Sequence, residues 1–275
     1  MPEKQACSSY ADMLGRDDLD IIYIASPNML HCAQAVEALR AGKHVIVEKP
    51  AAVTAGEVQE MYEAVKAGGV FFLEAITTLF MPNYLALKQL LPELGDICKA
   101  EFAYGQYSSK YDAYLRGENP NIFNPAMQGG ALNDMGIYCI HAVVDLFGEP
   151  EGVRYEAERG ENGVDLKGTL CLEYPGLTVH VYTSKKDTPK MRNGVLIEGE
   201  RGVLRQSGPF NEFPAVSACI DGAERPLAQQ PAGNRMVYEH AAFRDCILAH
   251  DEEFFERMYR QSLACARILE RAAKS

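Results

Sequence analysis

The chain has 275 residues, of which 47% are hydrophobic and 24% charged, and its formal net charge is −11. This length and apolar content are typical of a globular protein with one or two domains. An acidic chain without a basic cluster is poorly suited to bind nucleic acid or an anionic membrane surface. The eight cysteines are scattered, without metal-ligand spacing, so we expect reduced thiols and no metal centre.

The N-terminal residues lack the apolar core of a signal peptide. The longest apolar stretch, residues 70–81, is interrupted by Glu74 and by two threonines. Such a stretch is too short to cross a bilayer as a helix. These features predict a cytoplasmic protein.

The first clear fold signal is a β-α-β pattern. Residues 21–24 and 44–47 are short apolar runs, typical of strands buried on both faces of a parallel sheet. Between them, apolar residues recur at helical spacing after the breaker Ser26-Pro27-Asn28. Because ligands bind at the carboxyl ends of such strands, Lys49 is expected at a ligand-binding edge. The alternative is a solvated loop lysine.

A second helix and a third strand follow. Thr54 and Glu57 fit a capping box, and Gly68-Gly69 can end the helix that it opens. Residues 70–73 have the composition of another buried strand. This alternation predicts a doubly wound parallel α/β sheet, resembling part of a Rossmann fold. We expect this first domain to cover residues 1–76.

The pattern changes after residue 76. The expected elements are a helix over residues 82–91, a strand over 97–108, a polar loop over 110–128, an apolar helix over 131–147, a β-rich region over 151–220, and helices over 237–249 and 253–273. Strands in a meander with segregated helices predict an α+β domain with a large, mostly antiparallel sheet. We expect this second domain, for substrate binding and oligomerisation, to cover residues 77–275.

The apolar helix after Gly130 carries Asp134, Tyr138 and His141, which would share one face at about 3.6 residues per turn. A carboxylate beside a tyrosine can orient substrate hydroxyls, and the phenol can pass a proton if a nearby cation lowers its pKa. The alternative is an acidic residue at a helix N-terminus, a core tyrosine and a surface histidine. Spacing alone does not separate the two interpretations.

Three stretches together resemble the Gfo/Idh/MocA oxidoreductases: Ala25–His31, Glu48-Lys49-Pro50 and Gly129–Tyr138. Ile197-Glu198-Gly199, with Gly202, is similar to a late turn in that family. The resemblance extends over essentially the whole chain. It implies an enzyme that uses NAD or NADP to transfer hydride to or from a sugar, polyol or cyclic diol.

The resemblance also implies roles for single residues. Lys49, Asp134 and Tyr138 would be catalytic, with Tyr138 as general acid or base and Lys49 assisting it. His141 would join Lys49 and Asp134 in binding the substrate. The cofactor would contact Ser26, Pro27, Asn28, His31, Glu48 and Lys49. Tyr138 stands where many members have histidine, which resembles the branch of glucose–fructose oxidoreductase and dimeric dihydrodiol dehydrogenase.

The chain departs from that family at its beginning. The family opens with a strand, a Gly-x-Gly-x-x-Gly turn, a helix and a second strand, whereas Gly15 and Gly42 form no such motif. At about 30 residues for each β-α-β unit, about 50 residues would be missing. We expect either a truncated form of a full enzyme or an inactive paralogue that serves as an oligomeric binding module. A homodimer or higher homo-oligomer is expected in both cases.

The departure leads to a prediction about cofactor binding. Because glycine-rich turns and helix N-termini supply the pyrophosphate site, we expect this chain to bind NAD(H) and NADP(H) weakly or not at all. Titration of NADPH fluorescence should therefore show no saturation at low-micromolar protein. A low-micromolar dissociation constant for either cofactor would show that other residues replace that site.

Overall fold

The computed structural model describes residues 6–187, 193–225, 227 and 233–275. Two sheets organise these residues, one with three strands and one with eight. The small sheet is parallel, and the large one is mostly antiparallel. The predicted fold class is thus confirmed. In this part of the chain, no helix is long and apolar enough to cross a membrane.

The small sheet has the strand order β1-β2-β3, and helices connect its strands. Its elements are α1 (Tyr10–Leu14), β1 (Ile21–Ile24), α2 (His31–Arg40), β2 (His44–Glu48), α3 (Ala55–Gly68) and β3 (Phe72–Ala75). The predicted capping box is present, since the Thr54 side chain accepts from Glu57 N and the Glu57 carboxylate accepts from Thr54 N. Strands β2 and β3 have the expected buried centres.

Strand β1 differs from the sequence-based expectation. Ile22 and Ile24 are buried, but Ile21 is 39% exposed and Tyr23 is 40% exposed. Within the described residues, β1 pairs only with β2 and forms an edge of the sheet. The prediction of burial on both faces is wrong for this strand, because apolar composition does not distinguish a central strand from an edge strand.

The large sheet has the order β11-β10-β9-β8-β4-β7-β6-β5, and only the β4–β7 pair is parallel. Its strands are β4 (Ile97–Gly105), β5 (Gly152–Arg159), β6 (Asp165–Tyr174), β7 (Leu177–Ser184), β8 (Asn193–Gly199), β9 (Gly202–Ser207), β10 (Ala215–Ile220) and β11 (Ala223–Arg225). Along β6 and β7, residues such as Leu170 and Val181 point to the helices and are fully buried. This alternation matches the period-2 pattern of the sequence.

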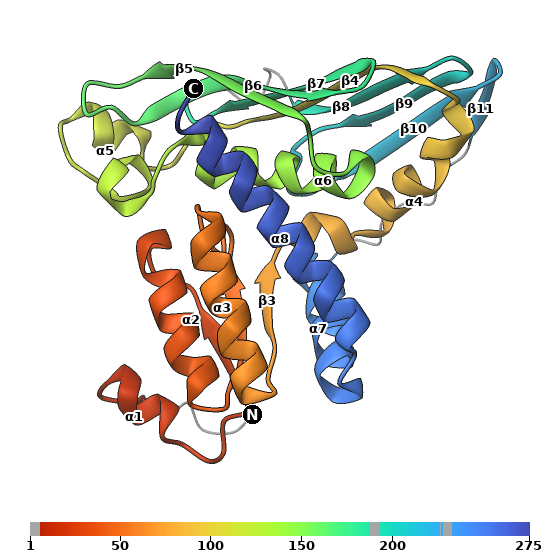
Figure 1. The fold of residues 1–275 in the computed structure, drawn as a ribbon. Helices are drawn as coiled ribbons and strands as arrows, with labels where there is room; N and C mark the ends of the chain where they lie inside the picture. The colour runs from red at the N-terminus through yellow and green to blue at the C-terminus, as the bar shows by residue number, and fades with distance from the viewer. Residues whose placement is uncertain (1–5, 188–192, 226, 228–232) are drawn as a thin grey trace.

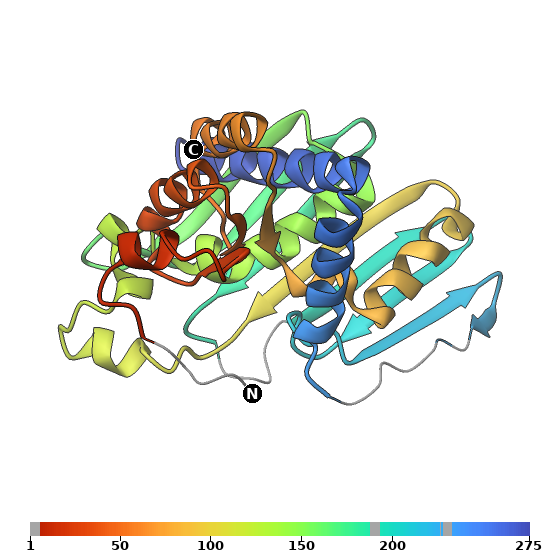
Figure 2. The ribbon, with the colours of Figure 1, turned by 90° about the horizontal axis from the view of Figure 1, so that it is seen from below.

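Helices lie against one face of the large sheet (Figure 1). They are α4 (Pro82–Leu90), α6 (Ile137–Phe147) and α8 (Glu252–Ala272), whereas α7 (Met236–Ala249) packs on the turn Thr77–Phe80 and on α8. Helix α8 packs on α6 and also on α3 and β3 of the small sheet, so the C-terminal helix joins the two parts of the chain (Figure 2). The region expected to be a polar loop contains the short helix α5 (Tyr111–Leu115).

The other face of the large sheet is covered by no described element (Figure 1). A shallow hollow of about 460 Å³ on this face is lined in part by Glu101, His180 and Leu196. Leu196 pairs laterally with Glu101 and Arg205, while its chain neighbours Val195 and Ile197 point into the core. A broad sheet face of mixed polarity is suited to isologous pairing with a second copy.

We therefore predict that the chain forms a homodimer through this face. A Leu196→Glu change places a charge at the centre of the predicted contact and should shift the protein to monomers in sedimentation velocity. Leu115→Glu is the matched control, because Leu115 is 61% exposed on α5 and should leave the assembly unchanged. A wild-type monomer at micromolar concentration would contradict the prediction.

Candidate active site

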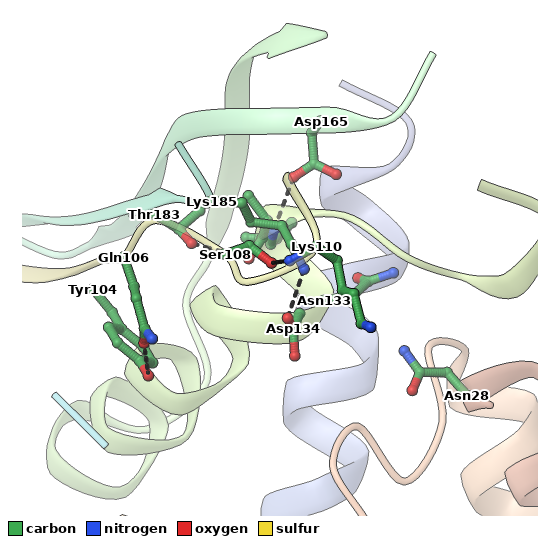
Figure 3. A network of polar contacts seen from close by, with 12 residues as sticks. Asn28, Tyr104, Gln106, Ser108, Lys110, Asn133, Asp134, Asp165, Thr183 and Lys185 are labelled. Atoms are coloured by element: carbon green, nitrogen blue, oxygen red, sulfur yellow. Dashed lines mark hydrogen bonds and ion pairs between the residues drawn. The ribbon is translucent and has the colours of Figure 1, made fainter. Parts of the chain in front are cut away.

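The carboxylate of Asp134 lies between two ammonium groups. Lys49 Nζ is 2.8 Å from Asp134 Oδ1, and Lys185 Nζ is 2.6 Å from Oδ2. Lys49 Nζ also donates to the Asp134 carbonyl oxygen at 2.7 Å. Figure 3 shows the Lys185 side chain above Asp134, with a dashed contact between them. Asp134 therefore joins the carboxyl end of the small sheet to the large sheet.

Asp134 belongs to a π-helical turn, Leu132–Gly136, which precedes α6. Two strands of the large sheet hold this turn. Asp165 Oδ2 accepts from Leu132 N at 2.8 Å, and Thr183 Oγ1 donates to the Ala131 carbonyl at 2.9 Å. At Gly130, φ is +130° and a Cβ would lie 1.9 Å from Asp165 Oδ1, so only glycine fits there.

Lys49 follows β2 and is fixed by its surroundings. The backbone N–H of Ala51 donates to Glu74 Oε1 at 2.9 Å. His31 Nδ1 lies 2.8 Å from the Pro50 carbonyl, and His31 Nε2 lies 2.9 Å from the Ser26 carbonyl. The buried imidazole thus links the loops after β1 and β2. These contacts give His31 a structural position behind the loops instead of the predicted place against a cofactor.

Tyr138 lies one turn after Asp134, with its ring centroid 4.8 Å from Lys49 Nζ. The Tyr104 ring packs edge-on against it at 5.8 Å. The structure therefore brings Lys49, Asp134 and Tyr138 together, but the ammonium contacts the ring face of the tyrosine. Burial raises the pKa of Tyr138, and Glu48 and Asp134 add to this effect, whereas Lys49 only partly opposes it. The expected net lowering of this pKa by the cation is wrong.

The charges of the lysine–aspartate pair stabilise each other. Burial would raise the pKa of Asp134, but Lys49 and Lys185 lower it well below its usual range. Burial would likewise lower the pKa of Lys49, but Asp134 more than offsets this and the pKa is raised. Both groups are therefore charged at neutral pH.

His141 does not share a cleft with Asp134 and Tyr138, and this prediction is wrong. Its side chain is fully buried, and Nε2 lies 3.2 Å from Glu74 Oε1. A π turn winds through fewer degrees per residue than an α turn. Residues after it therefore do not lie on the helix face that a count of about 3.6 residues per turn predicts. Ser262 Oγ donates to Glu74 Oε2 at 2.6 Å, which completes a buried link between β3, α6 and α8.

Lys185 was not predicted from the sequence, although a signal was present. It follows β7, where Val179, Val181 and Thr183 alternate inward and are all fully buried. Continuing that period-2 pattern places Lys185 on the same face.

A cavity of about 250 Å³ lies between the two parts of the chain. Its lining includes Ser26, Pro27, Asn28 and Asp134. Asn28 Nδ2 donates to the Gln128 carbonyl at 3.1 Å across this cleft, and Figure 3 shows Asn28 facing the Asp134 turn. Glu48 lies outside the lining and accepts from Tyr23 Oη at 2.6 Å.

The cavity fits one end of a dinucleotide. Its size and its Ser26 and Asn28 polar groups suit a nicotinamide ring with its ribose. A glycine-rich turn between a strand and a helix, which would hold the pyrophosphate, is not found among the described residues. The described residues therefore offer polar groups for the nicotinamide end but no glycine-rich turn for the pyrophosphate.

A parallel α/β sheet whose strand ends meet a lysine–aspartate–tyrosine cluster has the arrangement of a ligand-binding α/β domain. Residues 2–75 match the model of the Gfo/Idh/MocA oxidoreductase family with its NAD-binding Rossmann fold, and residues 84–205 match a C-terminal domain of that family. The chain belongs to the Gfo/Idh/MocA family, which confirms the resemblance found in the sequence.

Two curated relatives align with most of this chain. The NADP(+)-dependent scyllo-inositol 2-dehydrogenase IolU of Bacillus subtilis is 37% identical over 269 residues, covering 98% of this chain and 81% of the relative. Human trans-1,2-dihydrobenzene-1,2-diol dehydrogenase is 32% identical over 253 residues, covering 88% of this chain and 73% of the relative.

Solved structures share the fold. The 3-ketoreductase KijD10 of Actinomadura kijaniata, in complex with NADP, superposes with a TM-score of 0.80 at 22% identity, covering 97% of this chain and 80% of that chain. The aldose–aldose oxidoreductase of Caulobacter crescentus gives a TM-score of 0.80 at 24% identity, covering 95% and 79%.

The buried Glu74–His141 pair leads to a prediction about stability. Burial opposes both charges, yet the pKa of Glu74 is lowered, and Cys265 and Glu74 raise the pKa of His141 well above its usual value. The stabilisation from His141 is therefore lost as pH rises through its raised pKa. The contribution from Glu74 is lost as pH falls through its lowered pKa. The pair should stabilise the fold most between these limits.

Glu74→Gln should accordingly reduce the free energy of unfolding by about 3–5 kcal/mol near neutral pH, because it leaves a buried imidazolium without a counter-ion. The loss should shrink at alkaline pH, where His141 becomes neutral. Chemical denaturation across pH measures both effects. Glu63→Gln, at an exposed pair with Lys66, should cost less than about 1 kcal/mol. Equal losses for the two variants would contradict the assignment.

Proposed function

We propose that this protein interconverts a secondary alcohol and the matching ketone on a polyol or cyclic diol, with NAD(P) as the redox partner. The observation that carries the proposal is the convergence of Lys49, Asp134 and Tyr138 beside the cavity that Ser26 and Asn28 line. Two relatives named for an inositol and for a dihydrodiol support this substrate class.

The cofactor would lie with its nicotinamide end against Ser26, Pro27 and Asn28. When bound, it would supply the acceptor or donor of the hydride. Asp134 has a side chain that is 31% exposed, and it reaches the same cavity. This aspartate would accept a hydrogen bond from a hydroxyl next to the reacting carbon, which fixes the orientation of the substrate.

Lys49 has one ammonium proton that is not directed to Asp134. Of the three donors on its ammonium, two are directed to the carbonyl and Oδ1 of Asp134. The third can stabilise negative charge on the substrate oxygen as the carbonyl is reduced. Tyr138 would donate its phenolic proton to that oxygen, or accept one when the alcohol is oxidised.

The raised pKa values of Tyr138 and Lys49 favour reduction of the ketone at neutral pH. With both groups protonated, the site is ready to give a proton to a carbonyl oxygen. Reduction of a ketone should therefore proceed well at neutral pH and decline as the phenol ionises in the alkaline range. Oxidation of the alcohol needs the phenolate and should accelerate with rising pH over the same range.

The pH prediction is checked with initial rates in both directions at several pH values. Parallel profiles for reduction and oxidation would contradict Tyr138 as the group that exchanges the proton. Opposite slopes in the alkaline range are the expected result.

Tyr138→Phe tests the role of the phenol directly. It should lower kcat by about 10²–10⁴-fold with little change in KM, because proton transfer belongs to the transition state. Lys49→Met should impair both parameters, since Lys49 would contact the bound substrate. Tyr174→Phe is the matched control, because the Tyr174 hydroxyl donates to the Gly148 carbonyl away from the site. A fully active Tyr138→Phe protein would overturn the proposal.

A second candidate is a non-catalytic binding module that assembles through its large sheet. The exposure of Ile21 and Tyr23 on β1 favours it. The two candidate functions differ in whether the protein uses NAD(P) for hydride transfer. Turnover of any polyol with NAD(P) added at millimolar concentration would exclude the second candidate, because a binding module transfers no hydride.

A further inference from the structure

We propose that Lys185 is a positioning residue of the site, which holds the Asp134 carboxylate in one orientation and adds a second positive charge beside it. This inference rests on the proposed function for its catalytic consequence, but its contact with Asp134 stands on the geometry alone. Lys49 alone was expected as the cation of the site.

The environment of Lys185 is unusual for a lysine. Its side chain is 0% exposed, and its ammonium lies 2.6 Å from Asp134 Oδ2 and 4.9 Å from the centroid of the Phe123 ring. Its backbone N–H donates to the Leu166 carbonyl, which anchors the residue to β6. A buried ammonium is unfavourable without a partner. Lys185 therefore needs Asp134 as its counter-ion, just as Asp134 needs Lys185.

The contact with Lys185 fixes the aspartate. With Oδ1 on Lys49 and Oδ2 on Lys185, both carboxylate oxygens have a charged partner on opposite sides. Rotation about the Cβ–Cγ bond would break two charge-assisted hydrogen bonds. The carboxylate plane is therefore fixed, and Asp134 helps to line the cavity in this orientation. A substrate hydroxyl would meet an acceptor that is already oriented.

Lys185 also changes the charge of the site. It adds a second ammonium group beside the Lys49–Asp134 pair, and the Asp165 carboxylate offsets part of this added charge. A second cation near the substrate favours the alkoxide character that develops on the substrate oxygen during hydride transfer. Because Lys185 is fully buried behind Asp134, it acts through the aspartate and cannot touch the substrate.

The groups that face Lys185 come from three elements. Asp134 lies on the π turn, Lys49 follows β2, and Asp165 begins β6. Asp165 is already occupied, since its Oδ2 accepts from Leu132 N and from Tyr155 Oη. Burial and the like charge of Lys49 lower the pKa of Lys185, and Asp134 only partly offsets this. Lys185 therefore loses its proton more readily than Lys49, whose pKa is raised.

Lys185→Met tests the proposal, because methionine keeps the length and apolar body of the side chain and removes the charge. The matched control is Lys186→Met, which removes the neighbouring lysine that pairs with Glu158 at the surface. The first readout needs no turnover. With ¹³Cγ-labelled aspartate, the Asp134 resonance is assigned by its disappearance in Asp134→Asn and followed through an acid titration.

In wild type and in Lys186→Met, Asp134 should stay ionised throughout the acid range in which the protein is folded. In Lys185→Met its midpoint should rise by about one pH unit or more, because one of two cations is lost. Circular dichroism confirms that each variant is folded. An unchanged Asp134 titration in folded Lys185→Met would overturn the proposed hold on the carboxylate.

The second readout is turnover with NADPH added at millimolar concentration. Lys185→Met should lower kcat for ketone reduction about 10- to 100-fold with a smaller change in the KM for NADPH, whereas Lys186→Met should match wild type. Lys185→Arg, which keeps the charge, should recover part of the lost kcat. Wild-type kcat in Lys185→Met would overturn the catalytic part of the inference. If wild type itself reduces no polyol ketone, the proposed function fails, while the Asp134 titration still decides the role of Lys185.

Discussion

The two charge-assisted contacts of Asp134 are the constraint on which the arrangement of this protein depends. Lys49 reaches the carboxylate from the carboxyl end of β2, and Lys185 reaches it from the end of β7. The ion pairs therefore lie where the small sheet meets the large one. Removing one member of a buried ion pair typically costs about 3–5 kcal/mol, so the site and the docking of the two sheets are energetically linked.

A second network of buried polar contacts centres on Glu74. Glu74 on β3 accepts from Ala51 N, contacts His141 on α6 and accepts from Ser262 on α8. Ala51 comes two residues after Lys49, so this network fixes the loop that carries Lys49. Because the loop and the π turn are both fixed, the side chains of the cluster have little conformational freedom. Such rigidity is needed to orient a substrate.

Local periodicity predicted the architecture, including the parallel strands, the capping box and the spacing of Asp134 and Tyr138 on one helix. The roles of Lys49, Asp134 and Tyr138 were implied by the family resemblance. The failures have physical reasons. His141 was misplaced because a π turn breaks helical phase, and β1 because apolar composition does not reveal an edge. The pKa of Tyr138 depends on burial, which spacing does not report, and Lys185 meets Asp134 only through tertiary packing.

The most direct test of the account is a double-mutant cycle between Lys185 and Asp134, measured as free energies of unfolding. The variants are Lys185→Met, Asp134→Asn and the double mutant. If the carboxylate is held as described, the double mutant should be more stable than the sum of the single losses implies, by about 1 kcal/mol or more. Losses that add within about 0.5 kcal/mol would show that the two groups are not coupled, and would contradict the central claim.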